Sequence, residues 1–165
     1  MIVEIIYQPS NQLVEAEIAP ASISQIPPKE KGWNFNWKAA YEEKDSIVYA
    51  LKIRNDQESV EGMIELKVVH EMLVMEILEL APHNIGSKNK RYANVAGCLI
   101  AFACRASYKL DGEYKGFLTF TSKTKLLKWY EQKYFAKRGM GQRMYINPDD
   151  GIKLSSIYLR LRKQY

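Results

Sequence analysis

The stretch "NIGSKNKRYANVAGCLIAFACRAS", residues 84–107, changes within a few positions from a polar, basic loop into an almost uncharged helix. Its basic residues follow one another without an acidic residue among them: Lys88, Lys90, Arg91, Arg105 and, just beyond, Lys109. The first turn of a helix has unpaired N–H groups and a partial positive charge, and phosphate groups satisfy both. The stretch therefore predicts an anion-binding loop that leads into the N-terminus of a buried helix.

Three apolar segments lead up to this loop, and their patterns are those of β-strands. Residues 46–54 and 60–69 alternate between apolar and polar side chains. Residues 72–81 are apolar on both faces, which favours a central strand. Because His70 and Glu71 predict a tight reversal between the last two segments, we expect an antiparallel meander of three strands.

The remaining segments continue the alternation of strands and helices. A helix is predicted from Asn94, as its N-cap, to about Lys109, and a second over residues 124–134. A last helix begins after Asn147 and Pro148. Its inward residues are predicted to be Leu154, Ile157, Tyr158 and Leu161. Further strands are predicted over residues 1–7, 13–19, 115–122 and 139–147, and an edge strand or ordered loop over residues 33–37. We therefore predict a single α/β domain over residues 1–165.

Composition excludes several classes of protein. Hydrophobic residues make up 47% and charged residues 26% of the chain, which is typical of a globular protein. No apolar run approaches the roughly 20 residues of a membrane span, and no signal peptide is recognisable, so we expect a cytoplasmic protein without a membrane partner. Cys98 and Cys104 fall on one predicted helix and suggest neither a disulfide nor a metal site.

The net charge of +5 conceals an asymmetry between the two halves of the chain. Residues 1–85 carry a net charge of −7 and residues 86–165 a net charge of +12. The C-terminal half could attract an anion and the N-terminal half a cation. An unevenly charged, solvated surface would give the same counts.

Around the basic loop the chain resembles the GNAT superfamily of N-acetyltransferases. That family enters its helix with Gln or Arg, two residues, Gly, one residue and Gly or Ala, followed by paired aliphatic residues. The corresponding series here is Arg91, Asn94, Ala96, Leu99 and Ile100. The family's preceding strand ends as "LAP" does at residues 80–82, and its downstream tyrosine run resembles "WYEQKYF", residues 129–135.

The resemblance covers roughly residues 47–146. It implies an α/β (α+β) fold with a central, mostly antiparallel, mixed sheet of about six to seven strands flanked by helices. The chain departs from the family at Asn94, where a glycine is usual, and in a longer loop before Arg91. The glycine after the tyrosine run is replaced by Tyr134 or Phe135. An asparagine at the end of the next strand appears here as Ser122 or Lys123.

The resemblance implies acetyl-CoA as co-substrate, no metal, and a primary amine that attacks the thioester directly. Backbone N–H groups from Arg91 to Ala96 would hold the pyrophosphate, with charge from Lys88, Lys90 and Arg91. A solvated loop is the alternative for these three side chains. A bulge near the end of the central strand would expose Leu80 and its neighbours to the thioester carbonyl. The cofactor-binding residues implied are Leu80, Lys88, Lys90, Arg91, Ala93, Asn94, Val95, Ala96, Ser122 and Lys123.

Two protons must move in such a reaction, because the amine loses one and the departing thiolate takes one up. Tyr130 resembles the family's general acid, although it shares an apolar stripe with Leu126 and Tyr134 and is equally typical of a core aromatic. For the base we prefer Glu79, beside the expected bulge, over Glu76. Both carboxylates lie in an otherwise apolar strand and need a partner or a function. The alternative is that they point to solvent or pair with a lysine.

The acceptor stays open at this stage. Trp33, Phe35 and Trp37 line an acceptor pocket or pack as core or lid. We predict an N-acetyltransferase whose acceptor is a small-molecule amine or an amine carried by a protein or tRNA, and a homodimer is compatible with this prediction. The alternative is a catalytically silent module that binds CoA or RNA through its basic C-terminal half.

Overall fold

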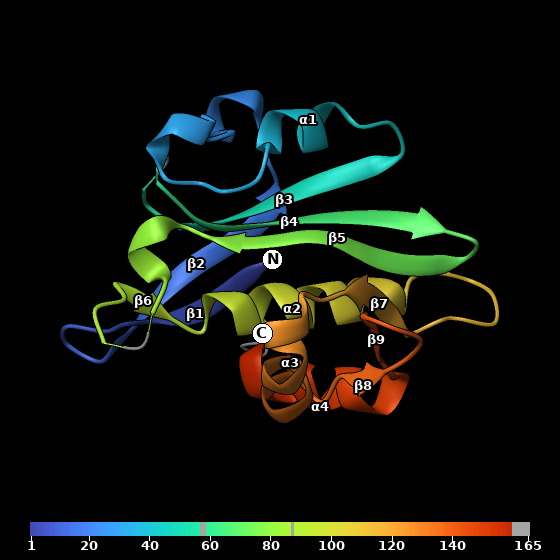
Figure 1. The fold of residues 1–165 in the computed structure, drawn as a ribbon. Helices are drawn as coiled ribbons and strands as arrows, with labels where there is room; N and C mark the ends of the chain where they lie inside the picture. Colours follow the sequence, from blue (N-terminus) through green and yellow to red (C-terminus); the bar gives the residue numbers. More distant parts are fainter. Residues whose placement is uncertain (57–58, 87, 160–165) are drawn as a thin grey trace, which may run out of the picture.

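The computed structural model describes residues 1–56, 59–86 and 88–159. Its strands are β1 Ile2–Tyr7, β2 Gln12–Pro20, β3 Ser46–Ile53, β4 Val60–Val69, β5 Met72–Leu80, β6 Tyr92–Ala93, β7 Leu118–Thr121, β8 Lys137–Arg138 and β9 Arg143–Ile146. They form one sheet in the order β6-β1-β2-β3-β4-β5-β7-β9-β8 (Figure 1). All pairs are antiparallel except β5 with β7. The sheet is mixed and mostly antiparallel, as predicted, and the two-residue strands β6 and β8 raise its strand count above six to seven.

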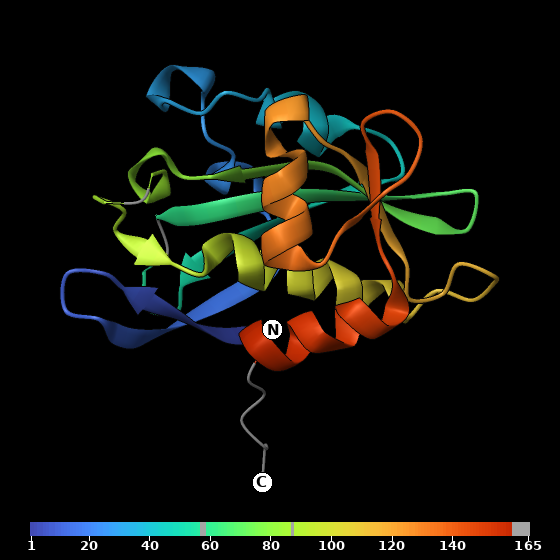
Figure 2. The same cartoon turned by 60° about the horizontal axis from the view of Figure 1, so that its bottom comes forward.

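Helices cover both faces of the sheet. One face carries α1, and α2, α3 and α4 lie on the other (Figures 1 and 2). The bounds of the helices in the described residues are α1 Trp37–Glu42, α2 Val95–Ser107, α3 Leu127–Tyr134 and α4 Pro148–Tyr158, with 3-10 turns at Ile23–Gln25, Lys29–Lys31, Pro82–Asn84 and Thr124–Leu126. None of these helices is long and apolar enough to cross a membrane.

The last helix begins as predicted, but one of the residues predicted to point inward is exposed. The Asn147 side chain accepts a hydrogen bond from the Asp150 N–H, and Pro148 follows at the first helical position. Leu154 is buried, whereas Ile157 is 49% exposed and was wrongly predicted to point inward. The helix packs against α2, and Ile157 lies on its exposed surface. Leu161 lies outside the described residues.

Two glycines bring α2 close to the layers on either side. A Cβ atom at Gly62 of β4 would lie 2.8 Å from Val95 Cγ1, and one at Gly97 would lie 2.2 Å from the Tyr158 ring. The Gly62 backbone therefore lies directly against the Val95 side chain of α2, and the Gly97 backbone against the Tyr158 ring of α4, with no room for a Cβ atom at either glycine. Cys98 and Cys104 of α2 are free, and burial raises the pKa of each thiol to about 12, so neither is a reactive thiolate.

Each face of the sheet has its own apolar cluster. The larger one lies between the sheet and α2, with Ile64 and Leu66 among its strand residues. The smaller one lies under α1, around Trp37 and Met63. Because side chains alternate along a strand, Glu65 shares the α1 face with Met63. The α1 face thus buries a carboxylate between apolar side chains, which the α2 face of this strand does not.

Candidate active site

The strands β5 and β7 part midway along the sheet. Their parallel pairing runs over three positions and ends at Met75 of β5 and Phe120 of β7. β5 continues to Leu80 with β4 on one side and no strand paired on the other. The gap between the two strands is the main irregularity of the sheet in the described residues.

A β-bulge in β5 marks the point where the strands part. Glu65 of β4 pairs with Ile77, whereas the next residue, Leu66, pairs with Met75, so Glu76 is an extra residue on β5. A bulge bends its strand and increases the local twist, which turns the end of β5 away from β7. The family resemblance implied such a bulge near the end of this strand, and the structure places it earlier, at Glu76.

The end of β5 offers two peptide groups to the gap. In an antiparallel pair, alternate residues direct their N–H and C=O groups at the partner strand. The Ala81 N–H donates to the Glu61 carbonyl oxygen at 3.0 Å, so Glu79, two residues before, also faces β4. Leu78 and Leu80 therefore direct their peptide groups to the open edge. The Leu80 peptide group, which the resemblance implies would meet the thioester carbonyl, is one of these.

Tyr130 of α3 lies beside the point where the strands part. Its ring centroid is 4.7 Å from that of Phe120, and the side chain is 8% exposed. The hydroxyl makes no hydrogen bond to the described residues. Every fully buried polar side-chain atom in those residues has a partner, so the Tyr130 hydroxyl is not fully buried and solvent can reach it. Burial raises the pKa of Tyr130 to about 12. The ring is a core aromatic, as one alternative held, and the hydroxyl stays available for chemistry.

At the N-terminus of α2, Asn94 takes a left-handed conformation with φ 72° and ψ 9°, and its side chain makes no capping hydrogen bond. The predicted side-chain cap is therefore wrong. Glycine favours this conformation, and asparagine is among the residues that tolerate it best, which explains Asn94 at the family's glycine position. The Cys98 N–H donates to the Asn94 carbonyl as the first helical bond. The N–H groups of Val95, Ala96 and Gly97 have no partner within the helix.

The N–H groups just before α2 are engaged by the protein itself. The Arg91 N–H donates to the His83 carbonyl at 2.8 Å, and the Tyr92 N–H donates to Asn84 Oδ1 at 2.9 Å. Ala93 is paired with β1. The prediction that this whole segment holds a pyrophosphate is therefore wrong for the N–H groups of Arg91 and Tyr92. These N–H groups are not free for a phosphate, because they bind residues 83–84 and the segment pairs with β1.

The fastening of the loop depends on a buried carboxylate of β4. Glu61 binds the ring of His83 through Nε2, accepts from Ser59 Oγ at 2.9 Å, and accepts from Asn84 Nδ2 at 3.2 Å. Asn84 Nδ2 also donates to the Glu61 carbonyl oxygen. His83 was predicted to be a loop residue, and its ring holds that loop against the strand.

Two cations of this region stand close to each other. Burial lowers the pKa of the Lys133 ammonium on α3, and the charge of Lys90 in the basic loop lowers it further. Neither lysine pairs with a carboxylate in the described part of the chain. Lys88 and Arg91 are exposed, as a solvated loop would have them. Lys133 was not predicted, although it belongs to the tyrosine run "WYEQKYF" that carried the resemblance.

Glu79 fastens the aromatic segment, residues 33–37, to the sheet. One carboxylate oxygen accepts from the Asn34 N–H at 2.6 Å, and the other accepts from the Phe35 N–H at 3.2 Å and Trp37 Nε1 at 2.8 Å. The side chain is 7% exposed. Three N–H donors thus occupy both oxygens, which favours a positioning role over the role of general base.

The aromatic segment reaches the end of β7. Trp33 and Trp37 are buried in the cluster under α1, as core packing predicted. Phe35 is partly exposed, and Lys123 Nζ lies 6.0 Å from the centroid of its ring. Ser122 is buried, and it donates its hydroxyl to the Lys123 carbonyl and its N–H to the Gln142 carbonyl. Of the two residues predicted here for the cofactor, Lys123 has the freer side chain.

A second group of carboxylates surrounds the bulge. Glu76 is exposed, whereas Glu65 is 1% exposed and accepts a hydrogen bond from Ser46 Oγ at 2.6 Å. Burial raises the pKa of the Glu65 carboxyl to about 7, and the charges of Glu43 and Glu76 raise it as well. The sequence analysis did not single out Glu65, because it is one of the polar residues that alternate with the apolar ones in residues 60–69. α1 covers that side, and a shallow pocket between them includes Glu65 and Ile77.

Sequence comparison gives no relative, because no protein-family model and no curated protein matches the chain. Among solved structures, the chain is similar to one in the KacTA–DNA complex, with 11% identity, 86% of this chain and 99% of that chain covered, and a TM-score of 0.61. It is also similar to a chimera of spermidine N-acetyltransferase SpeG from Vibrio cholerae and hSSAT, with 12% identity, 83% and 98% covered, and a TM-score of 0.53. The PaiA N-acetyltransferase from Thermoplasma acidophilum, in complex with coenzyme A, has 14% identity, 80% and 98% covered, and a TM-score of 0.51.

These likenesses show the fold. The chain has the fold of the GNAT acetyltransferases, and the resemblance first noted around the basic loop is confirmed at that level. At 11–14% identity the acceptor is not carried over from any of them. Within the described ranges, no group of three or more His, Cys, Asp or Glu side chains could hold a metal ion.

Proposed function

We propose that this protein is an N-acetyltransferase that takes an acetyl group from acetyl-CoA and passes it to a primary amine. The observation that carries the proposal is the gap between β5 and β7. Leu78 and Leu80, at the end of β5, direct peptide groups into this gap. Phe120 links the two sides, because it pairs with Met75 of β5 and its ring contacts the ring of Tyr130. Acetyltransferases of the same fold, one of them in complex with coenzyme A, support the proposal.

The first turn of α2 fits the phosphates of the donor. Its free N–H groups, from Val95 to Gly97, lie at the positive end of the helix dipole. Lys90 and Lys133 repel each other in the absence of an anion, and a phosphate near them would relieve that repulsion. The peptide-like arm of the donor would pair with the open edge of β5 as an added strand does.

In the proposed reaction the amine nitrogen attacks the thioester carbonyl carbon, so a C–N bond forms and the C–S bond breaks. The β5 edge donates an N–H to the oxygen on which charge develops. The Tyr130 hydroxyl gives its proton to the departing thiolate, and its raised pKa of about 12 keeps it protonated until then. The proton that the amine loses goes to a carboxylate.

For that carboxylate we favour Glu76 over Glu79. Glu76 is exposed at the bulge, whereas both oxygens of Glu79 hold the aromatic segment. Glu65 lies on the neighbouring strand, and with a pKa of about 7 it is suited to take up a proton near neutral pH.

The acceptor we propose is a cationic amine that enters from the α1 face. Glu43 and Glu76 bring carboxylates to this face beside the buried Glu65, whose pKa they raise, and in the described residues an ion pair joins Lys67 to Glu43 at 3.0 Å. Opposite charges steer diffusing partners together, and salt weakens the steering. For the preferred acceptor, kcat/KM should therefore fall as the ionic strength rises. A neutral or anionic preferred acceptor would contradict this part of the proposal.

The proposal is tested by binding and then by turnover. Calorimetry with CoA and with adenosine diphosphate should show binding of both, with CoA the tighter ligand, and acetyl-CoA should raise the melting temperature. Release of free thiol from acetyl-CoA is then followed across polyamines, lysine peptides, aminoacyl-tRNA mimics and neutral amines. Absence of binding up to millimolar CoA contradicts the proposal. Binding without thiol release from any amine favours the catalytically silent module.

A further inference from the structure

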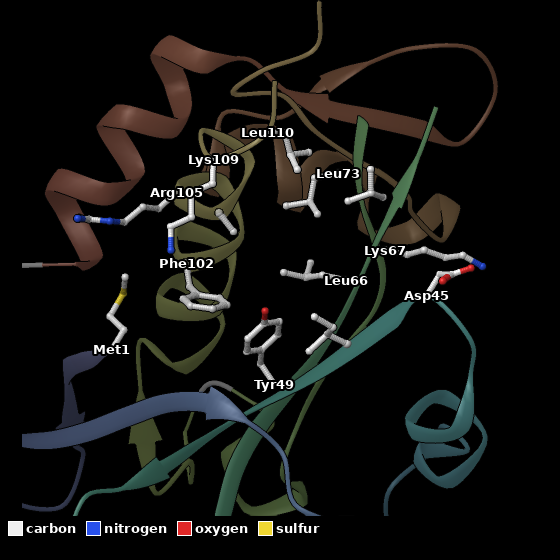
Figure 3. A pocket seen from close by; sticks show the side chains of 13 residues that line it. Met1, Asp45, Tyr49, Leu66, Lys67, Leu73, Phe102, Arg105, Lys109 and Leu110 are labelled. Carbon is white, nitrogen blue, oxygen red and sulfur yellow. The ribbon is translucent and has the colours of Figure 1, made fainter. Parts of the chain in front are cut away.

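A second cavity lies on the α2 face of the sheet, at the other end of α2 from the gap. It is enclosed by β3, β4, β5 and the C-terminal half of α2 and has a volume of about 260 Å³ (Figure 3). This is just below the ~300–1,000 Å³ typical of ligand pockets, so a small molecule would fill it. Since α2 rises about 1.5 Å per residue, Phe102 is some 10 Å from the helix start. The cavity is thus separate from the site proposed for the donor.

The walls of the cavity are apolar. Leu66 and Leu73 come from the strands, and Phe102 and Leu110 from α2 and the segment after it. The rings of Phe102 and Tyr49 meet edge to face with centroids 4.8 Å apart. An aromatic or branched apolar group would find matching surfaces on three sides.

The polar groups of the cavity are few and mostly positive. Figure 3 shows the Tyr49 hydroxyl turned into the cavity, the Lys109 ammonium on the side of α2, and the Arg105 guanidinium directed away along the rim. In the described residues, none of these three forms a hydrogen bond or ion pair through its side chain. Asp45 stands at the opposite rim with Lys67, whose charge it faces.

We propose that this cavity binds a small carboxylic acid with a compact apolar body. The Tyr49 hydroxyl and the Lys109 ammonium donate to the carboxylate, and the body lies against Phe102, Leu66 and Leu73. Charge-assisted hydrogen bonds of this kind are stronger than neutral ones, and an apolar surround strengthens them further. An amine would meet Lys109 and Arg105 instead, and Asp45 is already opposite Lys67. The proposal does not depend on the acetyl-transfer reaction.

Three probes of one shape separate the contributions. They are 3-phenylpropionate, its neutral amide and the corresponding amine, 3-phenylpropylamine. By calorimetry the acid should bind at least about 10-fold more tightly than the amide, a difference of about 1.4 kcal/mol, and the amine most weakly. Methyl NMR should place the bound acid at Leu66, Leu73 and Leu110. Equal affinity for acid and amide, preference for the amine, or shifts only at other methyl groups would overturn the proposal.

Variants of the lining make the test specific. Lys109→Gln should lower the affinity for the acid several-fold and the affinity for the amide much less. Tyr49→Phe should lower both affinities, since a carboxylate and an amide oxygen can each accept from the Tyr49 hydroxyl. Lys115→Gln, an exposed position in the next loop, is the matched control. Ala106→Phe should fill the cavity and abolish binding of both probes, and if it fails to fold, the two polar variants still decide. If Lys109 only offsets the negative end of the α2 dipole, Lys109→Gln will lower the melting temperature without changing acid affinity, and the proposal is wrong.

Discussion

The two faces of the sheet differ in whether they bury charged side chains. On the α2 face, the side chains of β4 and β5 meet α2 in a wholly apolar layer, and the cations stand at its margins, in the basic loop and on α3. On the α1 face, the same two strands bury Glu65 and Glu79 beneath a single short helix and an aromatic segment. Carboxylates are thus buried on the α1 face of these strands, whereas Lys90 and Lys133 lie near each other at the edge of the α2 layer.

The two faces therefore differ in the roles for which they are suited. The apolar layer under α2 includes Val95 at the helix start and Tyr130, the two places where we propose that the donor binds. The carboxylates of the α1 face each depend on a small number of donors, so their removal should change local order and protonation rather than the fold.

Tyr130→Phe tests the chemistry at the α2 side of the gap. The substitution keeps the ring against Phe120 and removes only the hydroxyl, so kcat should fall by roughly 10²-fold or more, the scale of positioned acid–base groups. Acetyl-CoA affinity and melting temperature should barely change. Steady-state kinetics with a verified acceptor, calorimetry and thermal denaturation check the three expectations. Full turnover by the phenylalanine variant would leave Tyr130 a core aromatic alone.

The pH profile sharpens the same prediction. Because burial raises the pKa of Tyr130 to about 12, the hydroxyl stays protonated through the ordinary working range. Below about pH 11, titration of Tyr130 should therefore cause no fall in rate. Any fall on the basic side should appear equally in the parent and in the Tyr130→Phe variant. A basic limb near pH 9 or 10, absent from the variant, would contradict the raised pKa.

Lys133→Gln tests the cationic margin of the α2 face. If Lys133 and Lys90 share a phosphate, CoA affinity should fall by about 10-fold, or about 1.4 kcal/mol. The melting temperature without ligand should stay the same or rise, because the substitution removes repulsion between two cations. Lys128→Gln, on the same helix beside Glu131 and Arg138, is the matched control and should bind CoA normally. Equal affinity in both variants would remove Lys133 from the site.

Glu79→Gln tests the fastening of the aromatic segment on the α1 face. Glutamine keeps the shape of the side chain but presents an NH₂ group to N–H donors, so we expect a loss of about 1–3 kcal/mol of unfolding free energy. Exposed Glu76→Gln is the control and should stay within about 0.5 kcal/mol of the parent. Urea denaturation followed by tryptophan fluorescence measures both. If Glu76→Gln destabilises the protein as much as Glu79→Gln, the hydrogen bonds to the segment are not the cause.

Glu65→Gln should change the pH dependence of stability more than stability itself. The folded state raises the pKa of Glu65 from 4.5 to about 7, so it binds the proton more tightly than the unfolded state does. The parent should therefore lose stability as the pH rises from about 4.5 to 7 through this group. The variant lacks this loss, and its melting temperature relative to the parent should be higher at pH 8 than at pH 5. The same difference at both pH values would show that Glu65 has an ordinary pKa.

Much of the fold was predictable from local patterns. The segments that became β3, β4 and β5 alternate or are continuously apolar over eight to ten residues, and Asn147 with Pro148 marks the start of α4. The short strands β6 and β8 were not predicted, because two residues carry no period and become strands only beside a partner. Ile157 was misjudged for a related reason, since the side of α4 that faces α2 is set by packing.

The candidate site was likewise predictable only in part. The resemblance around Arg91 and Asn94 pointed to the helix start and to Tyr130, and the structure brings Tyr130 to the end of the β5–β7 pairing. It did not reveal that Arg91 and Tyr92 use their N–H groups within the loop, nor that Glu65 is buried. Residues 65 and 133 were missed because their environments come from α1 and from the basic loop, which are distant in sequence.

The sequence by itself determined where strands and helices form, which strand is central, and that opposite charges lie in opposite halves of the chain. These properties follow from side-chain period, chain order and composition, all of which are local or additive. Only the tertiary structure decided where β5 bulges, which peptide groups remain free, and which glutamates are bonded. Those depend on strand register and on hydrogen bonds between residues such as Glu79 and Trp37, 42 positions apart, and no local pattern encodes a partner at that distance.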